Sequence, residues 1–335
     1  MRTVDALVCL RPGELRVERR PAPRPADGEV LVRPLRVGIC GTDYHIFEGT
    51  HPFLEYPRVM GHELAVELVE PAAGLSAGEV CIVNPYVSCG ACVACRNGKP
   101  NCCVHIAVLG VHRDGGMASL LAVPVGNLVA APGLTPDQCA TVEFLAIGAH
   151  AVRRAALSER DRVLVVGAGP IGLGVALFAR RTGAAVVVLD RDAGRLETAH
   201  ALTGAEPVPP GADPLACGLP DAAGFDVVFD ATGNPRSMEA CFDFVAHGGR
   251  CVLVGVVKEP IAFSDPDFHR KEMTLLGSRN ATSEDFRRVI AAIADGDIAT
   301  DRLITHRTDF ANAVRDIPRW AHEKVGLVKA VVELE

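Results

Sequence analysis

The chain has 335 residues, 49% of them hydrophobic, which is enough for about two domains with sizeable cores. Its 34 basic and 41 acidic residues give a net charge of −7, and the lack of a Lys/Arg-rich run argues against a nucleic-acid partner. No apolar stretch reaches the ~18 residues of a membrane span, and the charged N-terminal segment has no signal-peptide core, so we expect a cytoplasmic protein with no membrane partner.

The first part of the chain is predicted to form an all-β domain. Short strand-like runs broken by Gly and Pro extend to about residue 150. The clearest of these runs are Val30–Val37, Leu64–Glu70, Glu79–Val83 and Ser119–Pro124. Because such runs are typical of a partly closed barrel, we assign residues 1–150 to one domain.

This β domain contains a first candidate metal site. Cys40 precedes a short segment that ends at His45, His62 and Glu63 follow a glycine, and Glu143 comes near the end of the domain. A catalytic zinc ion takes three protein ligands from Cys, His and acidic residues and leaves one position open. The spacing alone does not establish a zinc site, because a single buried Cys or His is usually a packing residue or a satisfied polar group.

A second candidate metal site lies in a compact loop that contains several cysteines. Cys89, Cys92, Cys95 and Cys103 supply four thiolates, which together close a tetrahedral structural zinc site. The chain has twelve cysteines and no secretory signal, which favours metal over disulfides. An iron–sulfur cluster is the other alternative, and the adjacent Cys102 is an alternative fourth ligand.

From Ala151 onward the pattern changes to alternating strands and helices, which indicates a parallel sheet covered by helices. The first strand, Val163–Val166, is followed by a G-x-G-x-x-G turn, a helix over Leu173–Arg181 and a second strand over Ala185–Leu189. Further strands are predicted at Asp226–Asp230, Arg250–Gly255 and Met273–Gly277. This order predicts a Rossmann domain over residues 151–280.

The glycine turn predicts a dinucleotide site made of Gly167, Gly169, Pro170, Ile171 and Gly172. The first glycine allows the tight turn, the second lets the backbone approach a pyrophosphate, and the third lets helix and strand pack closely. Asp190 ends the second strand, where a carboxylate accepts hydrogen bonds from a ribose 2′-hydroxyl and repels a 2′-phosphate. NAD is therefore favoured over NADP, although the neighbouring Arg191 weakens that preference.

The end of the chain is predicted to return to the first domain. A helix is expected over Ser283–Ala294, with Thr282 or Ser283 as its N-cap, and a strand over Lys329–Leu334. Residues 281–335 would then complete the domain that begins at residue 1. The Rossmann domain would be an insertion.

Together these motifs resemble those of the zinc-dependent medium-chain alcohol and polyol dehydrogenases, of the sorbitol dehydrogenase type, over essentially the whole chain. The resemblance implies an α/β plus all-β fold, with a GroES-like catalytic domain and an inserted Rossmann domain. It also implies NAD and two zinc ions per chain, one catalytic and one structural. Cys40 and His62 match catalytic zinc ligands, Glu63 or Glu143 would be the third, and Cys103 would close the structural site.

The resemblance also assigns roles around the catalytic zinc. Asp43 matches an acid that orients the histidine ligand, and Thr42 and His45 match the two ends of a proton relay to solvent. Arg195 matches a basic residue that steadies the adenosine ribose. The implied chemistry is hydride transfer from an alcohol to the nicotinamide, and the implied assembly is a homodimer or homotetramer.

The expected substrate follows from the same resemblance. A Glu at position 143 is typical of the polyol branch, and the chain resembles bacterial dehydrogenases that oxidise L-galactonate or L-gulonate at C5. We therefore expect a sugar acid or polyol to be oxidised to the ketone. The candidate substrate-binding residues are Tyr44 and Phe47 as one wall, Arg113 and Arg279 for a carboxylate, and Asn280 for hydroxyls.

Three alternatives remain open. The first is another alcohol dehydrogenase of the family, such as an L-threonine 3-dehydrogenase. The second is a lyase or aldehyde dismutase on the same scaffold that recycles bound NAD. The third is a non-catalytic zinc- and nucleotide-binding module, which would not need an open metal site with a proton relay.

Overall fold

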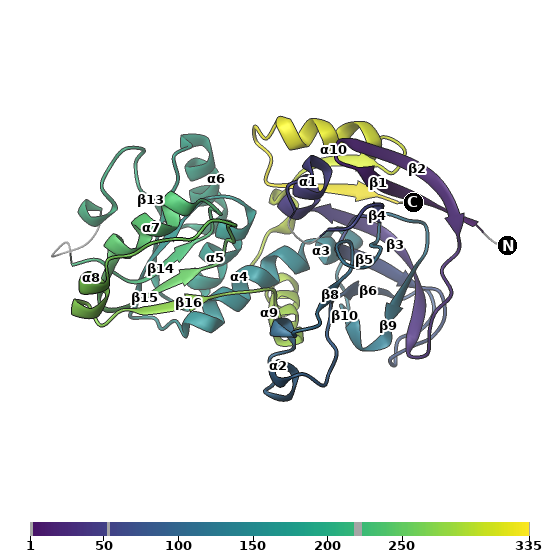
Figure 1. The fold of residues 1–335 in the computed structure, drawn as a ribbon, viewed down its shortest axis with the longest axis horizontal. Coiled ribbons are helices and arrows are strands. Elements are labelled where there is room, and N and C mark those ends of the chain that lie inside the picture. The colour runs from purple at the N-terminus through teal and green to yellow at the C-terminus, as the bar shows by residue number, and fades with distance from the viewer. Residues whose placement is uncertain (1–2, 52–53, 218–222, 335) are drawn as a thin grey trace. The chain divides into compact units, whose positions relative to one another are not determined.

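The computed structural model describes residues 3–51, 54–217 and 223–334, and the chain divides into two compact units (Figure 1). Unit 1 comprises Met1–Glu143 and Ala281–Glu335, and unit 2 comprises Phe144–Asn280. The domain boundary expected at residue 150 lies inside α4 (Val142–Ala155). Because this helix is continuous, no break in the residue pattern marks the division between the units.

Unit 1 is built around a mixed sheet with the order β10-β6-β5-β3-β18-β17, in which β9 also pairs with β3 and the pairs are antiparallel except for β17 and β18. A second sheet has the order β2-β1-β4, and β7 pairs with β8. The strands are β1 (Thr3–Arg11), β2 (Glu14–Pro21), β3 (Glu29–Ile39), β4 (Arg58–Val59), β5 (Glu63–Leu68), β6 (Val80–Val83), β7 (Tyr86–Val87), β8 (Ala107–Val108), β9 (Leu121–Pro124), β10 (Leu128–Ala130), β17 (Ile304–Asp309) and β18 (Lys329–Glu333). Its helices are α1 (Gly41–Glu48), α2 (Val93–Arg96), α3 (Pro136–Ala140), α9 (Ser283–Ala294) and α10 (Ala313–His322).

The C-terminal strand is an integral part of this sheet. β18 pairs antiparallel with β3, so that Val331 lies opposite Gly38, and it pairs in parallel with β17. Figure 1 shows this yellow segment beside the purple N-terminal strands. The helix predicted before it is α9, which begins after Thr282 with a capping box formed by Thr282 and Asp285.

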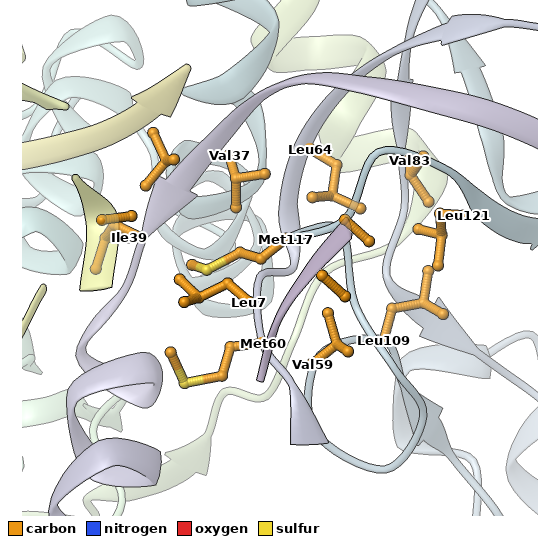
Figure 2. Close-up of a cluster of buried hydrophobic side chains, with 14 of the residues drawn as sticks. Leu7, Val37, Ile39, Val59, Met60, Leu64, Val83, Leu109, Met117 and Leu121 are labelled. Carbon is orange, nitrogen blue, oxygen red and sulfur yellow. The ribbon is translucent and has the colours of Figure 1, made fainter. Parts of the chain in front are cut away.

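The core of unit 1 lies between its sheets and consists of aliphatic side chains from several strands. Figure 2 shows Leu7, Val37, Leu64 and Met117 pointing toward one another, and all four are fully buried. The strands beside this core are buried along most of their length, as in β5, where five of the six residues are buried. Burial of such side chains stabilises each by about 1.5–3 kcal/mol, so the core holds the surrounding loops in place.

Unit 2 is a six-stranded parallel sheet with the order β13-β12-β11-β14-β15-β16. Its elements are β11 (Arg162–Val166), α5 (Pro170–Arg181), β12 (Ala185–Leu189), α6 (Ala193–Thr203), β13 (Glu206–Pro207), β14 (Phe225–Asp230), α7 (Pro235–Phe244), β15 (Val245–Leu253), α8 (Asp265–Arg270) and β16 (Thr274–Gly277). The order reverses at β11, which is the topological switch point of a Rossmann sheet, so the predicted fold is confirmed. None of the helices that the structure describes combines the length and apolar character needed to cross a bilayer.

One strand of unit 2 begins earlier than the sequence predicts. β15 starts at Val245, whereas the prediction began at Arg250. Phe225 pairs with Val245, and a register shift follows before Val227 pairs with Arg250. His247, Gly248 and Gly249 lie in this irregular part of the strand, and their polar and glycine-rich sequence hides it from a pattern-based prediction.

Candidate active site

The first candidate metal site brings together Cys40, His62 and Glu63, whose ligand atoms all lie within 4.8 Å of one another. Cys40 is the N-cap of α1, His62 directly precedes β5, and Glu63 is the first residue of that strand. His62 and Glu63 are buried. A thiol, an imidazole and a carboxylate within this distance fit the three-ligand set of a catalytic zinc ion.

Asp43 holds the two segments of this site together. Its fully buried carboxylate accepts hydrogen bonds from the backbone N–H groups of Cys40, at 2.9 Å, and Gly61, at 3.3 Å. One of its oxygens lies 3.9 Å from Nδ1 of His62. Burial raises the pKa of Asp43, although the nearby His62 opposes that shift. Asp43 therefore lies behind the His62 ring, and its 3.9 Å approach is an electrostatic contact, not a hydrogen bond.

His62 shows that the pocket suits a cation. Its Nδ1 atom is buried and has no hydrogen-bond partner among the described residues. Burial lowers the pKa of His62, but the Cys40 thiol and the Asp43 carboxylate outweigh that effect and hold the pKa well above its ordinary value. The same negatively charged neighbours would attract a metal cation, which would displace the proton because a histidine ligand is neutral.

Glu63 is paired with a buried lysine. Both of its carboxylate oxygens accept hydrogen bonds from Nζ of Lys329, at 2.7 and 2.8 Å, and the same ammonium group donates to the Ile39 carbonyl at 3.2 Å. Lys329 is only 1% exposed. A Cβ atom on Gly38 would collide with the Glu63 side chain, so the glycine provides the space that the acid occupies.

Glu143 lies outside the three-residue cluster and has a different partner. Its buried carboxylate accepts a hydrogen bond from the hydroxyl of Tyr86, which is also buried. Burial raises the pKa of Glu143, and the nearby charge of Glu63 adds to that shift while His62 opposes it. Of the two acids that the sequence left open, the structure therefore brings Glu63 into the cluster and holds Glu143 beside Tyr86.

The two expected relay residues both lie on α1, one helical turn apart. The hydroxyl of Thr42 is 3.9 Å from the Cys40 thiol, so it faces the candidate metal site. The His45 side chain is 60% exposed and its Nδ1 lies 3.0 Å from the hydroxyl of Thr50. The helix thus presents one polar group toward the site and another toward solvent.

The five expected substrate residues are not gathered in one place within either unit. Tyr44 and Phe47 pack into the buried core of unit 1, and the ammonium group of Lys324 lies 5.4 Å from the centre of the Tyr44 ring. Arg113 forms an ion pair with Glu29 at 2.5 Å. Arg279 is exposed and Asn280, with φ of 54°, follows it after β16 in unit 2.

The cysteine loop forms a second cluster in unit 1. The sulfur atoms of Cys89, Cys92, Cys95 and Cys103 lie within 4.8 Å of one another, with 3.5 Å between Cys92 and Cys95 and 3.9 Å between Cys92 and Cys103. Zinc–sulfur bonds of about 2.3 Å place thiolates about 3.8 Å apart at the corners of a tetrahedron. Cys102 is exposed and outside the cluster. The four sulfurs therefore fit a closed zinc site.

Backbone groups prepare these sulfurs for a metal. The N–H groups of Cys92 and Val104 donate to sulfur atoms of Cys89 and Cys92, at 3.4 and 3.5 Å. Hydrogen bonds from the backbone of Cys95 and Val104 lower the pKa of Cys92 to about 6. Desolvation and the neighbouring thiols of Cys92 and Cys103 raise the pKa of Cys95 to about 11, so Cys92 is the thiol that is prepared to bind metal as a thiolate near neutral pH.

The glycine turn of unit 2 has the geometry that a dinucleotide site requires. Gly167 has φ of 100°, which residues with a Cβ rarely adopt. A Cβ atom on Gly172 would overlap the carbonyl oxygen of Gly167, so close packing of helix and strand requires glycine there. A Cβ atom on Gly169 would project into open space at the N-terminus of α5. Pro170 and Ile171 form the first turn of that helix, whose N–H groups suit a pyrophosphate.

Asp190 follows β12 beside this turn. Its two oxygens accept hydrogen bonds from the N–H groups of Ala168, at 2.7 Å, and Asp192, at 2.9 Å. Each carboxylate oxygen keeps a further lone pair, so the group can still accept from ribose hydroxyls. Arg191 and Arg195 are exposed, and the backbone of Arg195 is held in the first turn of α6 by Asp192.

Sequence reasoning missed two residues of the metal site, Lys329 and Tyr86. A lysine that opens the apolar strand Lys329–Glu333 is a possible signal, because lysine is rarely buried without a partner. Tyr86 follows Asn84 and Pro85 in a short polar segment and gives no comparable signal. Their acidic partners are far away in the sequence.

Comparisons with known proteins agree with this geometry. The family model described as alcohol dehydrogenase GroES-like domain matches residues 26–133, and the model described as zinc-binding dehydrogenase matches residues 170–295. The L-galactonate-5-dehydrogenase of Escherichia coli K12 is 44% identical over an alignment of 340 positions, which covers 99% of this chain and 99% of that protein.

Solved structures are similar over the whole chain. An alcohol dehydrogenase from Escherichia coli CFT073 in complex with NADH has a TM-score of 0.91 at 31% identity, covering 99% of each chain. A zinc-binding dehydrogenase from Sinorhizobium meliloti 1021 bound to NADP has a TM-score of 0.90 at 29% identity, covering 100% of each chain.

The buried ion pair leads to a prediction about stability. Lys329→Met should lower the free energy of unfolding of unit 1 by about 3–5 kcal/mol in metal-free protein, because it leaves the Glu63 charge buried and unpaired. The loss should be smaller in zinc-loaded protein, where the metal neutralises that charge. Urea unfolding followed by the fluorescence of Trp320, the single tryptophan, reports on this unit.

The double variant Glu63→Gln/Lys329→Met should recover most of the loss in metal-free protein. Lys324→Met, at an exposed lysine of the same unit, should cost at most about 1 kcal/mol. An equal loss for Lys329→Met with and without zinc would contradict the role given to this pair.

Proposed function

Because the chain belongs to the zinc-dependent medium-chain alcohol and polyol dehydrogenases, we propose that it oxidises a secondary alcohol of a hexonate to the ketone. It is an oxidoreductase that uses zinc and a nicotinamide dinucleotide, as its family does. The observation that carries the substrate class is the 44% identity, over nearly the full length of both chains, to an L-galactonate-5-dehydrogenase. L-Galactonate and L-gulonate, oxidised at C5, are the first candidates.

The metal site supports this chemistry. A zinc ion held there would supply the Lewis acid that lowers the pKa of an alcohol, and a bound nicotinamide would supply the hydride acceptor. In this proposal Cys40, His62 and Glu63 hold the catalytic zinc. Asp43 fixes the ring of His62, and Glu143, hydrogen-bonded to Tyr86, is the acid next to the site. Cys89, Cys92, Cys95 and Cys103 hold the structural zinc.

The proton released from the substrate needs a path to solvent. We assign its first acceptor to Oγ1 of Thr42, which faces the metal cluster, and its exit to the exposed imidazole of His45. The two residues are one turn apart on α1, so this helix would supply both ends of the path. Gly167, Gly169, Pro170, Ile171, Gly172, Asp190 and Arg195 are the residues proposed to bind the cofactor.

Cysteines that bind metal must stay reduced, and cysteines stay reduced in a reducing compartment. The cysteines of the metal loop therefore favour a cytoplasmic location, which is part of the proposal. It also includes a homodimer or homotetramer. Unit 2 exposes the apolar side chains of Val256, Phe263 and Leu275, and Leu275 lies on the edge strand β16. Such exposed apolar groups are consistent with contact between copies of the chain.

The position of Asp190 predicts a preference for NAD over NADP. Its carboxylate lies where a 2′-phosphate would approach, and the repulsion should disfavour NADP. Asp190→Ser should reduce the preference by about tenfold or more, with Arg191 then able to pair with the phosphate. The ratio of kcat/KM for the two cofactors measures the effect. A wild-type enzyme that already prefers NADP would contradict the assignment.

The substrate class predicts the result of an NAD-reduction panel of hexonates, hexitols, pentitols, L-threonine and simple alcohols. We expect a hexonate to give the highest kcat/KM. Faster turnover of L-threonine or ethanol than of every sugar acid and polyol would refute the proposal. Turnover without net NADH formation would instead indicate the dismutase or lyase alternative.

Arg279 is the proposed partner of the substrate carboxylate, because it is exposed and a guanidinium group can bind a carboxylate through two hydrogen bonds. Arg279→Ala should lower kcat/KM for a hexonate by at least about tenfold more than for the matching uncharged hexitol. Arg113→Ala provides the comparison and should affect both substrates equally. If Arg279→Ala lowered kcat/KM equally for the hexonate and the hexitol, Arg279 would not bind the carboxylate, and the dehydrogenase assignment would be unchanged.

A further inference from the structure

Asp230 is a fully buried acid at the end of β14, with a set of contacts that the metal and glycine motifs do not explain. One carboxylate oxygen accepts hydrogen bonds from the N–H and the hydroxyl of Thr232, at 3.1 and 3.0 Å. The other accepts from the hydroxyl of Ser237 at 2.7 Å and lies 3.7 Å from the thiol of Cys241. One carboxylate thus binds the end of a strand, the turn after it and the first two turns of α7.

Every one of these donors is uncharged. An ionised carboxylate is only an acceptor, so it fixes the direction in which each hydroxyl points its hydrogen. The Thr232 hydroxyl in turn accepts from the N–H of Asn234 at 3.1 Å, and the Asn234 side chain caps α7 by accepting from the N–H of Ser237. A continuous chain of hydrogen bonds therefore determines the shape of the turn from Ala231 to Asn234.

This turn packs against the glycine turn of the dinucleotide site. Asp230 lies opposite Val166 in the parallel register, and the N–H of Ala231 donates to the Val166 carbonyl at 2.8 Å. A Cβ atom on Gly167 would lie 3.0 Å from the Thr232 methyl group. Because β11 and β14 flank the point where the strand order reverses, the two turns form adjacent walls of the crevice in which a dinucleotide binds.

The two halves of a dinucleotide would therefore lie on opposite sides of the point where the strand order reverses. Asp190 at the end of β12 would bind the adenosine ribose, and the N-terminus of α5 would bind the pyrophosphate. The end of β14, with the turn after Asp230, would then be left for the nicotinamide half. We propose that Asp230 is a positioning residue that pre-organises this turn for the nicotinamide half, an inference that rests on the proposed role of the crevice as the NAD site.

Strand β14 also offers a control residue, Asp226, near its N-terminal end. The Asp226 carboxylate accepts hydrogen bonds from the backbone and the guanidinium group of Arg162, at 2.8 and 3.1 Å. These contacts lie at the N-terminal end of the sheet, opposite the crevice. Replacing Asp226 therefore removes comparable hydrogen bonds from β14 without changing the turn that Asp230 holds.

The test compares ADP-ribose, which lacks nicotinamide, with NADH. Dissociation constants are measured on zinc-loaded protein without substrate, by fluorescence titration for NADH and calorimetry for ADP-ribose. Asp230→Ala should weaken NADH binding by about tenfold or more, because hydrogen bonds to a charged group are lost from the turn, and ADP-ribose binding by less than about threefold. Asp226→Ala should leave both constants within about twofold.

Asp230→Asn keeps one oxygen acceptor and should fall between wild type and Asp230→Ala. If Asp230→Ala does not fold, Thr232→Val removes the hydroxyl that bonds to Asp230 and Asn234, and Ser237→Ala removes one hydroxyl donor to Asp230. Each variant should weaken NADH binding more than ADP-ribose binding. Equal losses for the two ligands, or wild-type affinity in folded Asp230→Ala, would overturn the positioning role. A wild-type protein that binds neither ligand would overturn the NAD site itself as well.

Discussion

The buried ion pair between Glu63 and Lys329 is the interaction on which the geometry of the candidate metal site depends. A carboxylate that is fully removed from water costs several kcal/mol unless a cation and hydrogen-bond donors compensate for it. Here the cation comes from β18, at the opposite end of the chain, and its ammonium group also binds the carbonyl of Ile39, next to Cys40. The C-terminal strand is therefore part of the site.

This requirement also explains the organisation of the domains. Unit 1 needs residues 281–335 because they supply β18, its pairing with β3 and the lysine that pairs with Glu63. Unit 2 can be inserted between the two halves because its parallel sheet is a complete structure with its own core. The other buried acids also have hydrogen-bond donors that compensate for the loss of water. Asp43 accepts from backbone N–H groups, Glu143 from Tyr86, and Asp230 from hydroxyls.

Local features of this molecule could be predicted from the sequence. The G-x-G-x-x-G turn and the cysteine loop are each determined by residues close together in the chain, and α9 occurs at its predicted residues with Thr282 as its cap. The features that escaped prediction depend on distant pairing. Lys329 and Glu63 are separated by 266 residues, and Tyr86 and Glu143 by 57. Tyr44 and Phe47 seemed suited to a substrate wall, but their helix turns both into the core.

The central claim is that one zinc ion is held by Cys40, His62 and Glu63, and a second by the four cysteines. Anomalous diffraction measured on both sides of the zinc absorption edge tests this most directly. The account predicts two zinc peaks per chain, one among the atoms of each cluster. It also predicts that Glu63 is nearer to the first peak than Glu143 is. A single peak, or a peak bound by Glu143 with Glu63 still held by Lys329, would contradict it.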